Sequence, residues 1–257
     1  GLRFLSETLR HVGFYGLAAS TIPLQPYGGL GLITDTCLNN VPFDSLVPLS
    51  GFAGAAAPPA VAGVPCINAA NFSAGSPVLI ARLSTGIPVT DVNDDGDPSD
   101  GMTEARQPGF TETVYVQSDV NSGFVFQGGN LAAYLAAEGK RHANNRFYPV
   151  FPFQLHVYYI RPCSRPSGGA GSTVCRAGDD GGRPIPTLVR QELAGTALQE
   201  RPLAEGIEGM SLLYGIDTAG GVGGDGDGIA DSYVADPVSA DRWSRVVTVR
   251  VALLVRR

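Results

Sequence analysis

The chain has 257 residues, of which 44% are hydrophobic and 16% charged, and it contains 34 glycines and 19 prolines. This length can bury a real core in one large domain, and the composition favours a loop-rich, mainly β protein over a helical bundle or a disordered chain. The net charge of −6 argues against nucleic acid as a partner. The sequence also lacks any run of about 18 apolar residues that would span a membrane.

The chain begins with a predicted helix at residues 1–16. Leu2, Leu5, Leu9 and Val12 repeat at spacings of three and four, which places them along one face of a helix, and two glycines supply the stop. A helix of about 12 residues is marginal by itself, and this one has no N-terminal cap. We therefore expect it to be the end of a longer helix whose first half is missing from this sequence.

The remainder, residues 17–257, is expected to form a sheet with long loops. Residues 17–76 are rich in glycine, proline and alanine and predict irregular coil and short turns. Strands are predicted at 77–83, 153–162, 185–193, 210–216 and 245–257, a hairpin at 111–128 and a short helix at 131–139. We find no domain boundary, so the expected fold is a single α+β domain. Its N-terminal helix packs on a mainly antiparallel sheet with long loop insertions.

The last predicted strand has the clearest alternation in the chain. Apolar residues occupy every second position on one face, at Val247, Val249, Val251, Leu253 and Val255. The other face carries Thr248, Arg250 and Arg256. A period of two with one apolar face is typical of a half-buried strand, so the chain is expected to end in a sheet.

The four cysteines are Cys37, Cys66, Cys163 and Cys175, and their spacings match no zinc or redox C-x-x-C pattern. An even number in a loop-rich chain indicates two disulfides and an oxidising compartment. We expect neighbours to pair, Cys37 with Cys66 and Cys163 with Cys175. Three pairings are possible in principle and the spacing does not choose between them; four buried free thiols are the alternative.

The first of two acidic loops predicts a calcium site. Its candidate ligands are Asp91, Asn93, Asp95, Asp97 and Asp100. Aspartate, asparagine and aspartate at positions 1, 3 and 5, followed by glycine at position 6, match the opening of a calcium loop, because side chains on alternate residues can converge on one cation. Position 12 is a methionine instead of the usual glutamate. A solvated acidic turn is the alternative.

The second acidic loop is a weaker calcium candidate. Asp225 and Asp227 form an Asp-x-Asp-Gly core, with Asp231 after it, but the expected first ligand is Gly223. Asp217 takes that place only if the glycine-rich insert between them folds back. The alternative is a hairpin loop in which aspartate and glycine supply the turn geometry.

No catalytic signature is present. The three histidines are His11, His142 and His156, and the sequence has no G-x-S-x-G, H-E-x-x-H or phosphate-binding loop motif. Paired acids can run glycoside hydrolysis, but here they cluster in glycine-rich loops, where a cation relieves their repulsion better than proton transfer does. We therefore expect a protein that is not an enzyme and has no catalytic residues.

Several segments, taken in order, resemble the PilW-type minor pilins of type IV pili. The opening FLSETLRHVGFYG is similar to the helix just after the membrane-spanning half in that family. EGIEGMSLLYGIDT, GDGDGIADSYV and WSRVVTVRVALLVR resemble its C-terminal part, and PVLIARL and HVYYIRPC with GGRPIPTLVRQEL fit its middle strands. The loop at 217–231 departs from the compact aspartate-rich form expected there, because AGGVGG is inserted.

The resemblance implies a type IV pilin-like fold and a non-enzymatic role. Pilins of this kind are expected to start pilus assembly in a priming complex at the tip, with other minor pilins, the major pilin and a tip adhesin as partners. The protein would then belong to the bacterial cell envelope, in the inner membrane through the missing N-terminal segment before assembly and at the extracellular pilus tip afterwards. The helix seam of Leu2, Leu5 and Leu9 would face neighbouring helices, its own sheet, or both.

Two other functions remain open on the sequence. A minor pseudopilin of a type II secretion system would share the architecture. A protein of another class, a calcium-dependent adhesin or carbohydrate-binding module, would account for the acidic loops without any role in assembly. A glycosidase is the third and most distant alternative.

Overall fold

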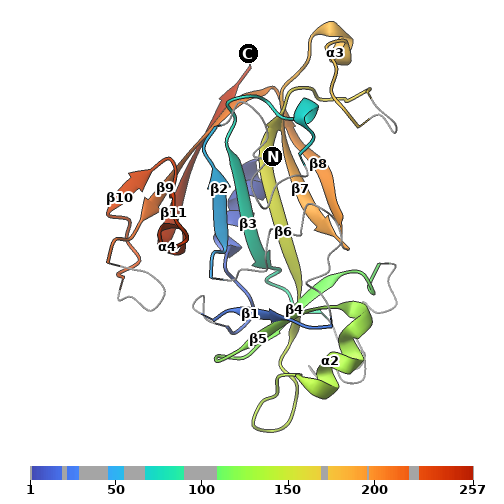
Figure 1. Cartoon of the computed structure of the whole chain (residues 1–257), viewed down its shortest axis with the longest axis vertical. Coiled ribbons are helices and arrows are strands. Elements are labelled where there is room, and N and C mark those ends of the chain that lie inside the picture. The colour runs from blue at the N-terminus through green and yellow to red at the C-terminus, as the bar shows by residue number, and fades with distance from the viewer. Residues whose placement is uncertain are drawn as a thin grey trace.

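The computed structural model describes residues 2–18, 22–28, 46–54, 67–89, 109–168, 173–195, 197–219 and 226–256. Their strands form two sheets, one of eight strands and one of three (Figure 1). The acidic loop at 91–100 and the pair Cys37 and Cys66 lie outside the described residues. The first calcium site and the first disulfide therefore stay predictions.

The eight-stranded sheet is mainly antiparallel, as predicted. Its strands are β1 (Leu24–Pro26), β2 (Leu49–Phe52), β3 (Val78–Ser84), β4 (Val114–Ser118), β5 (Gly123–Gln127), β6 (Val150–Arg161), β7 (Thr187–Ala194) and β8 (Ala197–Glu205). Only the pair of β1 and β5 is parallel within this part of the chain. A one-turn 3₁₀ helix, η2 (Ala69–Asn71), precedes β3, and another, η5 (Gly128–Asn130), leads from β5 into α2 (Leu131–Ala137).

The long strand β6 organises this sheet, because three other strands pair with it. Its first residues pair with β4, its middle with β3 and its last with β7. Side chains on a strand alternate between faces, and here both faces are covered. Phe153, Leu155, Val157 and Tyr159 join one core cluster, as the sequence predicted, while Tyr158 and Ile160 join another.

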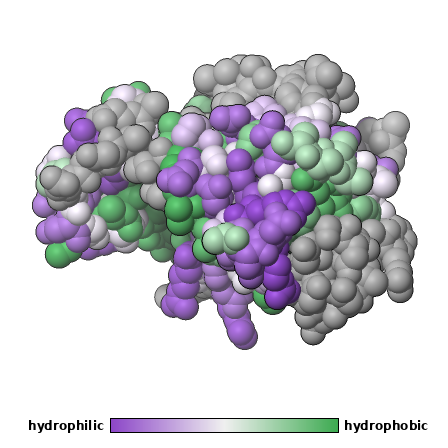
Figure 2. Space-filling view, turned by 90° about the horizontal axis from the view of Figure 1, so that it is seen from below, coloured by the Kyte–Doolittle hydropathy of each residue, from purple (hydrophilic) through white to green (hydrophobic). Residues whose placement is uncertain are grey.

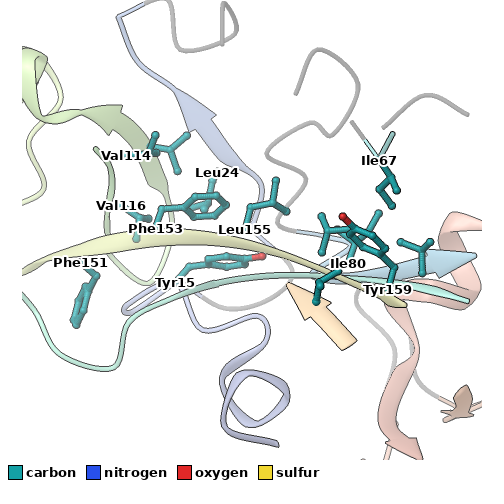
Figure 3. Packing of buried hydrophobic residues seen from close by; sticks show 14 of the residues in the cluster. Tyr15, Leu24, Ile67, Ile80, Val114, Val116, Phe151, Phe153, Leu155 and Tyr159 are labelled. Carbon is teal, nitrogen blue, oxygen red and sulfur yellow. The ribbon is translucent and has the colours of Figure 1, made fainter. Parts of the chain in front are cut away.

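The first cluster fills the face that β6 shares with β4, β5 and β1 (Figure 3). Tyr15, just after the first helix, stacks on Phe153 with ring centroids 6.3 Å apart. Ser118 fixes this entry, since its hydroxyl donates to the carbonyl of Tyr15 and accepts from the amides of Leu17 and Ala18. Tyr15, which falls within the predicted helix at 1–16, lies beyond the end of the observed helix and is anchored in the core.

The three-stranded sheet contains β10 (Ser232–Val234), β9 (Ile207–Ile216) and β11 (Val246–Val255), in that order and all antiparallel. It lies to the left of the larger sheet in Figure 1, with the short helix α4 (Ala240–Ser244) beside β11. The chain passes from β8 in one sheet to β9 in the other through a single residue, Gly206. Its φ of +75° lies in the left-handed region that glycine adopts without strain.

The first helix, α1 (Leu2–His11), is confirmed and lies between the two sheets. It ends at His11, earlier than the predicted bound at residue 16, because Gly13, one of the two predicted stop glycines, takes a positive φ and donates its amide to the carbonyl of Arg82 in β3. Leu5 belongs to the second core cluster together with Leu79 of β3 and Leu212 of β9. One apolar helix face thus joins the start of the chain to its last sheet.

Several elements differ from the sequence predictions. Short strands β1 and β2 occupy parts of the predicted coil, and β8 was not expected as a strand. In β11, Val246 pairs with Ile216 and Thr248 with Gly215, so Val247 is the extra residue of a bulge and is 43% exposed. Val255 follows a second irregularity and is 57% exposed. The prediction that these two valines share the buried face is therefore wrong; the residues that pack inward are Val246, Val249, Val251 and Leu253.

Candidate functional site

A groove of about 740 Å³, whose lining mixes apolar side chains with Ser6, Arg10, Ser244 and Thr248, runs between α1 and β11. The helix side is formed by Leu5, Leu9 and Val12, and Leu49 of β2 lies beside them. The other wall comes from the end of α4 and from β11, through Trp243, Val246, Val247, Thr248, Val249 and Val251. In the view from below, hydrophobic residues are visible between the three-stranded sheet and the rest of the molecule (Figure 2).

The predicted helix seam packs on the chain's own core over part of its length. Leu5 is 2% exposed, while Leu9 and Val12 are partly buried against the same cluster and line the groove. The side chain of Leu2 lies outside the described residues. Phe4 points away from this seam and is 55% exposed. The helix therefore has one face buried in its own domain and another that faces solvent.

Buried hydrogen bonds hold α1 on the larger sheet. The Tyr158 hydroxyl donates to Oγ1 of Thr8 at 2.7 Å, and this oxygen lies 3.2 Å from Nδ1 of His156. Thr8 and His156 are 6% and 5% exposed, so these groups have little access to water. Polar groups buried in this way stabilise a position only when they are satisfied. The hydrogen bonds of Thr8 to Tyr158 and His156 therefore fix which turn of α1 lies over β6.

His156 is held neutral by its surroundings. Burial and, to a smaller extent, the nearby Arg190 guanidinium lower the pKa of its imidazole to about 4, while Glu192 opposes the shift. Because the Thr8 oxygen already accepts from Tyr158, its own hydrogen is free to bond to Nδ1 when the neutral ring carries its proton on Nε2. Protonation would remove this acceptor and bury a charge beneath the helix.

Trp243 shapes the far wall of the groove. Ser239 begins α4 and its hydroxyl accepts from the amide of Arg242 at 3.3 Å, so the short helix starts on a regular cap. The cap brings the indole of Trp243 against the ring of Tyr214, edge to face, with centroids 4.7 Å apart. Tyr214 belongs to β9, so this contact holds α4 on the inner face of the small sheet. Burial raises the pKa of the Tyr214 hydroxyl.

The outer edge of β11 borders this groove and is open. The order β10-β9-β11 leaves one edge of β11 without a strand partner in the described part of the chain. Asp217 donates its amide to the carbonyl of Arg245, and Arg256 donates to that of Gly206. These bonds show that Val246 and Val255, at the two ends of β11, form non-hydrogen-bonded pairs with β9. Hydrogen-bonded and non-hydrogen-bonded pairs alternate along the strand, and counting from either end gives the same assignment. The N–H and C=O groups of Val249, Val251 and Leu253 therefore point away from β9.

Arg10 places a charge in the lining of the groove, on its helix side. On β11, the guanidinium of Arg250 lies on the outer face of the small sheet, 3.8 Å from the ring centroid of Tyr233. Arg256, farther along the strand, is ion-paired with Glu208 of β9. Arg10 and Arg250 therefore place positive charge beside this edge.

Residues 170–257 match the family model of the type IV pilus-assembly protein W, PilW. The C-terminal third of this chain is similar to PilW-type pilus proteins. The resemblance inferred from the sequence is thus confirmed over this region, which links the chain to type IV pilus assembly and to the cell envelope. Comparisons with curated proteins and with solved structures gave no significant match.

The PilW region supplies the strand wall of the groove, while α1 lies outside it. It contains β7 to β11, α3 (Asp179–Gly182) and α4, and it begins just before the second cysteine pair closes. Among the helices that the structure describes, none combines the length and the apolar character required to cross a bilayer.

The second acidic loop, which lies in the PilW region, is held in shape by hydrogen bonds to its own carboxylates. Asp217 is 2% exposed and accepts from the amides of Ala219 and Gly228. Asp231 accepts from the hydroxyl and the amide of Thr218, which lowers the pKa of its carboxyl. Asp227 accepts only a local bond from Ile229 among those described. Asp225 lies outside the described residues, so calcium at this loop stays a prediction.

Cys163 and Cys175 form a disulfide, the pairing expected for this part of the chain. Asp179 and Asp180 brace the segment that it closes: Asp179 accepts from Ser167 and Arg176, and Asp180 accepts from Ser164. The cysteines and Asp179 lie within ligand distance of one another, but both sulfurs are engaged in the disulfide. We interpret this cluster as a structural brace.

The histidines each have a local structural contact. His11 contacts the carbonyl of Glu7 one turn back, His142 packs on the ring of Tyr148, and His156 contacts Thr8. Sequence patterns identified both walls of the groove separately, through the seam of α1 and the alternation of β11. They did not show that the two walls face each other, because no local signal records a contact between residues about 240 positions apart.

Proposed function

We propose that this protein is a minor pilin that takes part in the initiation of type IV pilus assembly, without catalysis. The observation that carries the proposal is the match of residues 170–257 to the PilW family model. The arrangement of the remaining chain supports it. An N-terminal helix lies on a mainly antiparallel sheet with one face exposed, which is how a type IV pilin-like subunit would present its helix to neighbours.

The proposed partners are other minor pilins and the major pilin. These subunits would form a priming complex at the pilus tip, with a tip adhesin as a further member. The protein would work in the bacterial envelope before assembly and at the extracellular tip afterwards. The disulfide supports this location, since such bonds persist in oxidising compartments.

Deletion of the gene tests the proposal. We expect fewer surface pili and reduced twitching, both restored when the wild-type gene is supplied from a plasmid. Secretion of type II substrates is measured in the same strains. Unchanged pili and twitching would refute the assembly role, and loss of secretion with normal pili would point to the pseudopilin function instead.

A further inference from the structure

The outer edge of β11 is open in the described part of the chain. Strands with ten residues and free main-chain groups are normally shielded at a sheet edge by charge, proline or a covering loop, because they pair readily with other chains. Here β11 has ten residues, Leu254 and Val255 are 63% and 57% exposed, and the sheet has three strands in the described part of the chain. Its opposite edge is the three-residue β10.

We propose that β11 receives an extended, acidic segment of another pilus subunit as a fourth strand, seated in the groove beside α1. The outward N–H and C=O groups of Val249, Val251 and Leu253 would pair with the incoming main chain. Its alternate side chains would enter the groove, against Leu9 and Val12. Pairing of this kind draws affinity from the main chain and selectivity from the pockets.

The groove favours a strand over a helix as the occupant. Val249 and Val251, whose N–H and C=O groups point away from β9, both line it. An occupant of the groove therefore lies beside the main-chain groups of this edge. A helix would cover the apolar wall but leave the main-chain groups of this edge unpaired.

Charge selects the partner. Arg250 lies on the outer face of β11, and two copies of β11 pairing antiparallel would bring their Arg250 side chains together near the symmetry axis. Like charges across a strand pair are destabilising. An incoming strand with acidic residues on its outer face would instead meet the Arg250 guanidinium. The edge is therefore matched to a different chain and not to a second copy.

The identification of the partner as a pilus subunit rests on the proposed function, but strand addition can be measured on the purified protein. The probe is a synthetic peptide of about nine residues, EVTVEVTVE, whose valines share one face when it is extended. Trp243 is the single tryptophan of the chain and lines the groove. Since the peptide has none, its binding is followed by the emission of Trp243.

A matched pair of variants separates main-chain pairing from packing. Val251→Pro removes an N–H that points away from β9, so the ladder with β9 remains intact, whereas Val251→Ala shortens the same side chain and keeps the N–H. We expect the proline variant to lose at least about tenfold in affinity and the alanine variant to stay within about threefold of the wild type. A peptide with lysine in place of glutamate should bind more weakly than the acidic one.

Equal binding to both Val251 variants, stronger binding of the lysine peptide, or no saturable change in Trp243 emission would each overturn the proposal. Should Val251→Pro fail to fold, Arg250→Glu decides, because it must reverse the preference between the two peptides. Failure of these tests alongside pilus loss on gene deletion would leave the assembly role standing. Peptide binding with normal pili in the deletion strain would refute the assembly role instead.

Discussion

Protonation of His156 should loosen the protein in mild acid, because this histidine supports α1 from beneath. Its folded pKa of about 4 lies below the usual value of 6.5, so the unfolded chain takes up the proton first as the pH falls. The stabilisation is complete above about pH 6.5 and is lost progressively as the pH approaches 4, at about 1.4 kcal/mol per pH unit. At about pH 4.5 the loss amounts to about 2.5 kcal/mol.

The measurement is urea unfolding at about pH 7 and about pH 4.5, for the wild type and for His156→Gln. Glutamine keeps a side-chain acceptor for Thr8 but does not titrate, so the acid-induced loss should be about 2.5 kcal/mol smaller in this variant than in the wild type. His142→Gln is the matched control, since His142 is exposed, and should retain the full loss. Equal pH dependence in wild type and His156→Gln would refute the reasoning.

Three further outcomes are expected. Glu200→Ala should lower the free energy of unfolding by about 3 kcal/mol, because the carboxylate is the ion-pair partner of Arg161, whose side chain is only 4% exposed; a change in the urea midpoint near zero would contradict this. Replacing both Cys163 and Cys175 by serine should cost about 3 kcal/mol in the chain-entropy account of a loop of this size, and an unchanged melting temperature would show that the brace is dispensable. Calcium should raise the melting temperature, and chelation should reverse the rise, if the loop at 91–100 binds it; no shift would reject a structural site there.

The sequence predicted those parts of the fold whose signal is local. Alternation identified most of β6 and β11, and spacings of three and four with closing glycines identified α1. Prediction from local patterns failed for β8, because its sequence ALQERPLAE mixes charged residues with proline and does not alternate regularly between apolar and polar residues. That strand forms because β7 offers it a ladder, which is a tertiary cause that local propensity does not contain.

The face assignment of β11 shows a second limit. The bulge at Val247 shifts the phase by one residue, and a phase shift moves side chains to the other face of the strand. Alternation assumes a regular strand, so it placed Val247 inside and Val246 outside. The candidate groove shares this limit, since its two walls come from opposite ends of the chain and only the packing of the second core cluster joins them.

The location of those two walls has a consequence for biosynthesis. Residues 5–12 are synthesised well before residues 246–251, and the groove needs both. A chain whose synthesis stops before β11 therefore lacks the strand wall of the groove and the edge proposed to receive a partner strand.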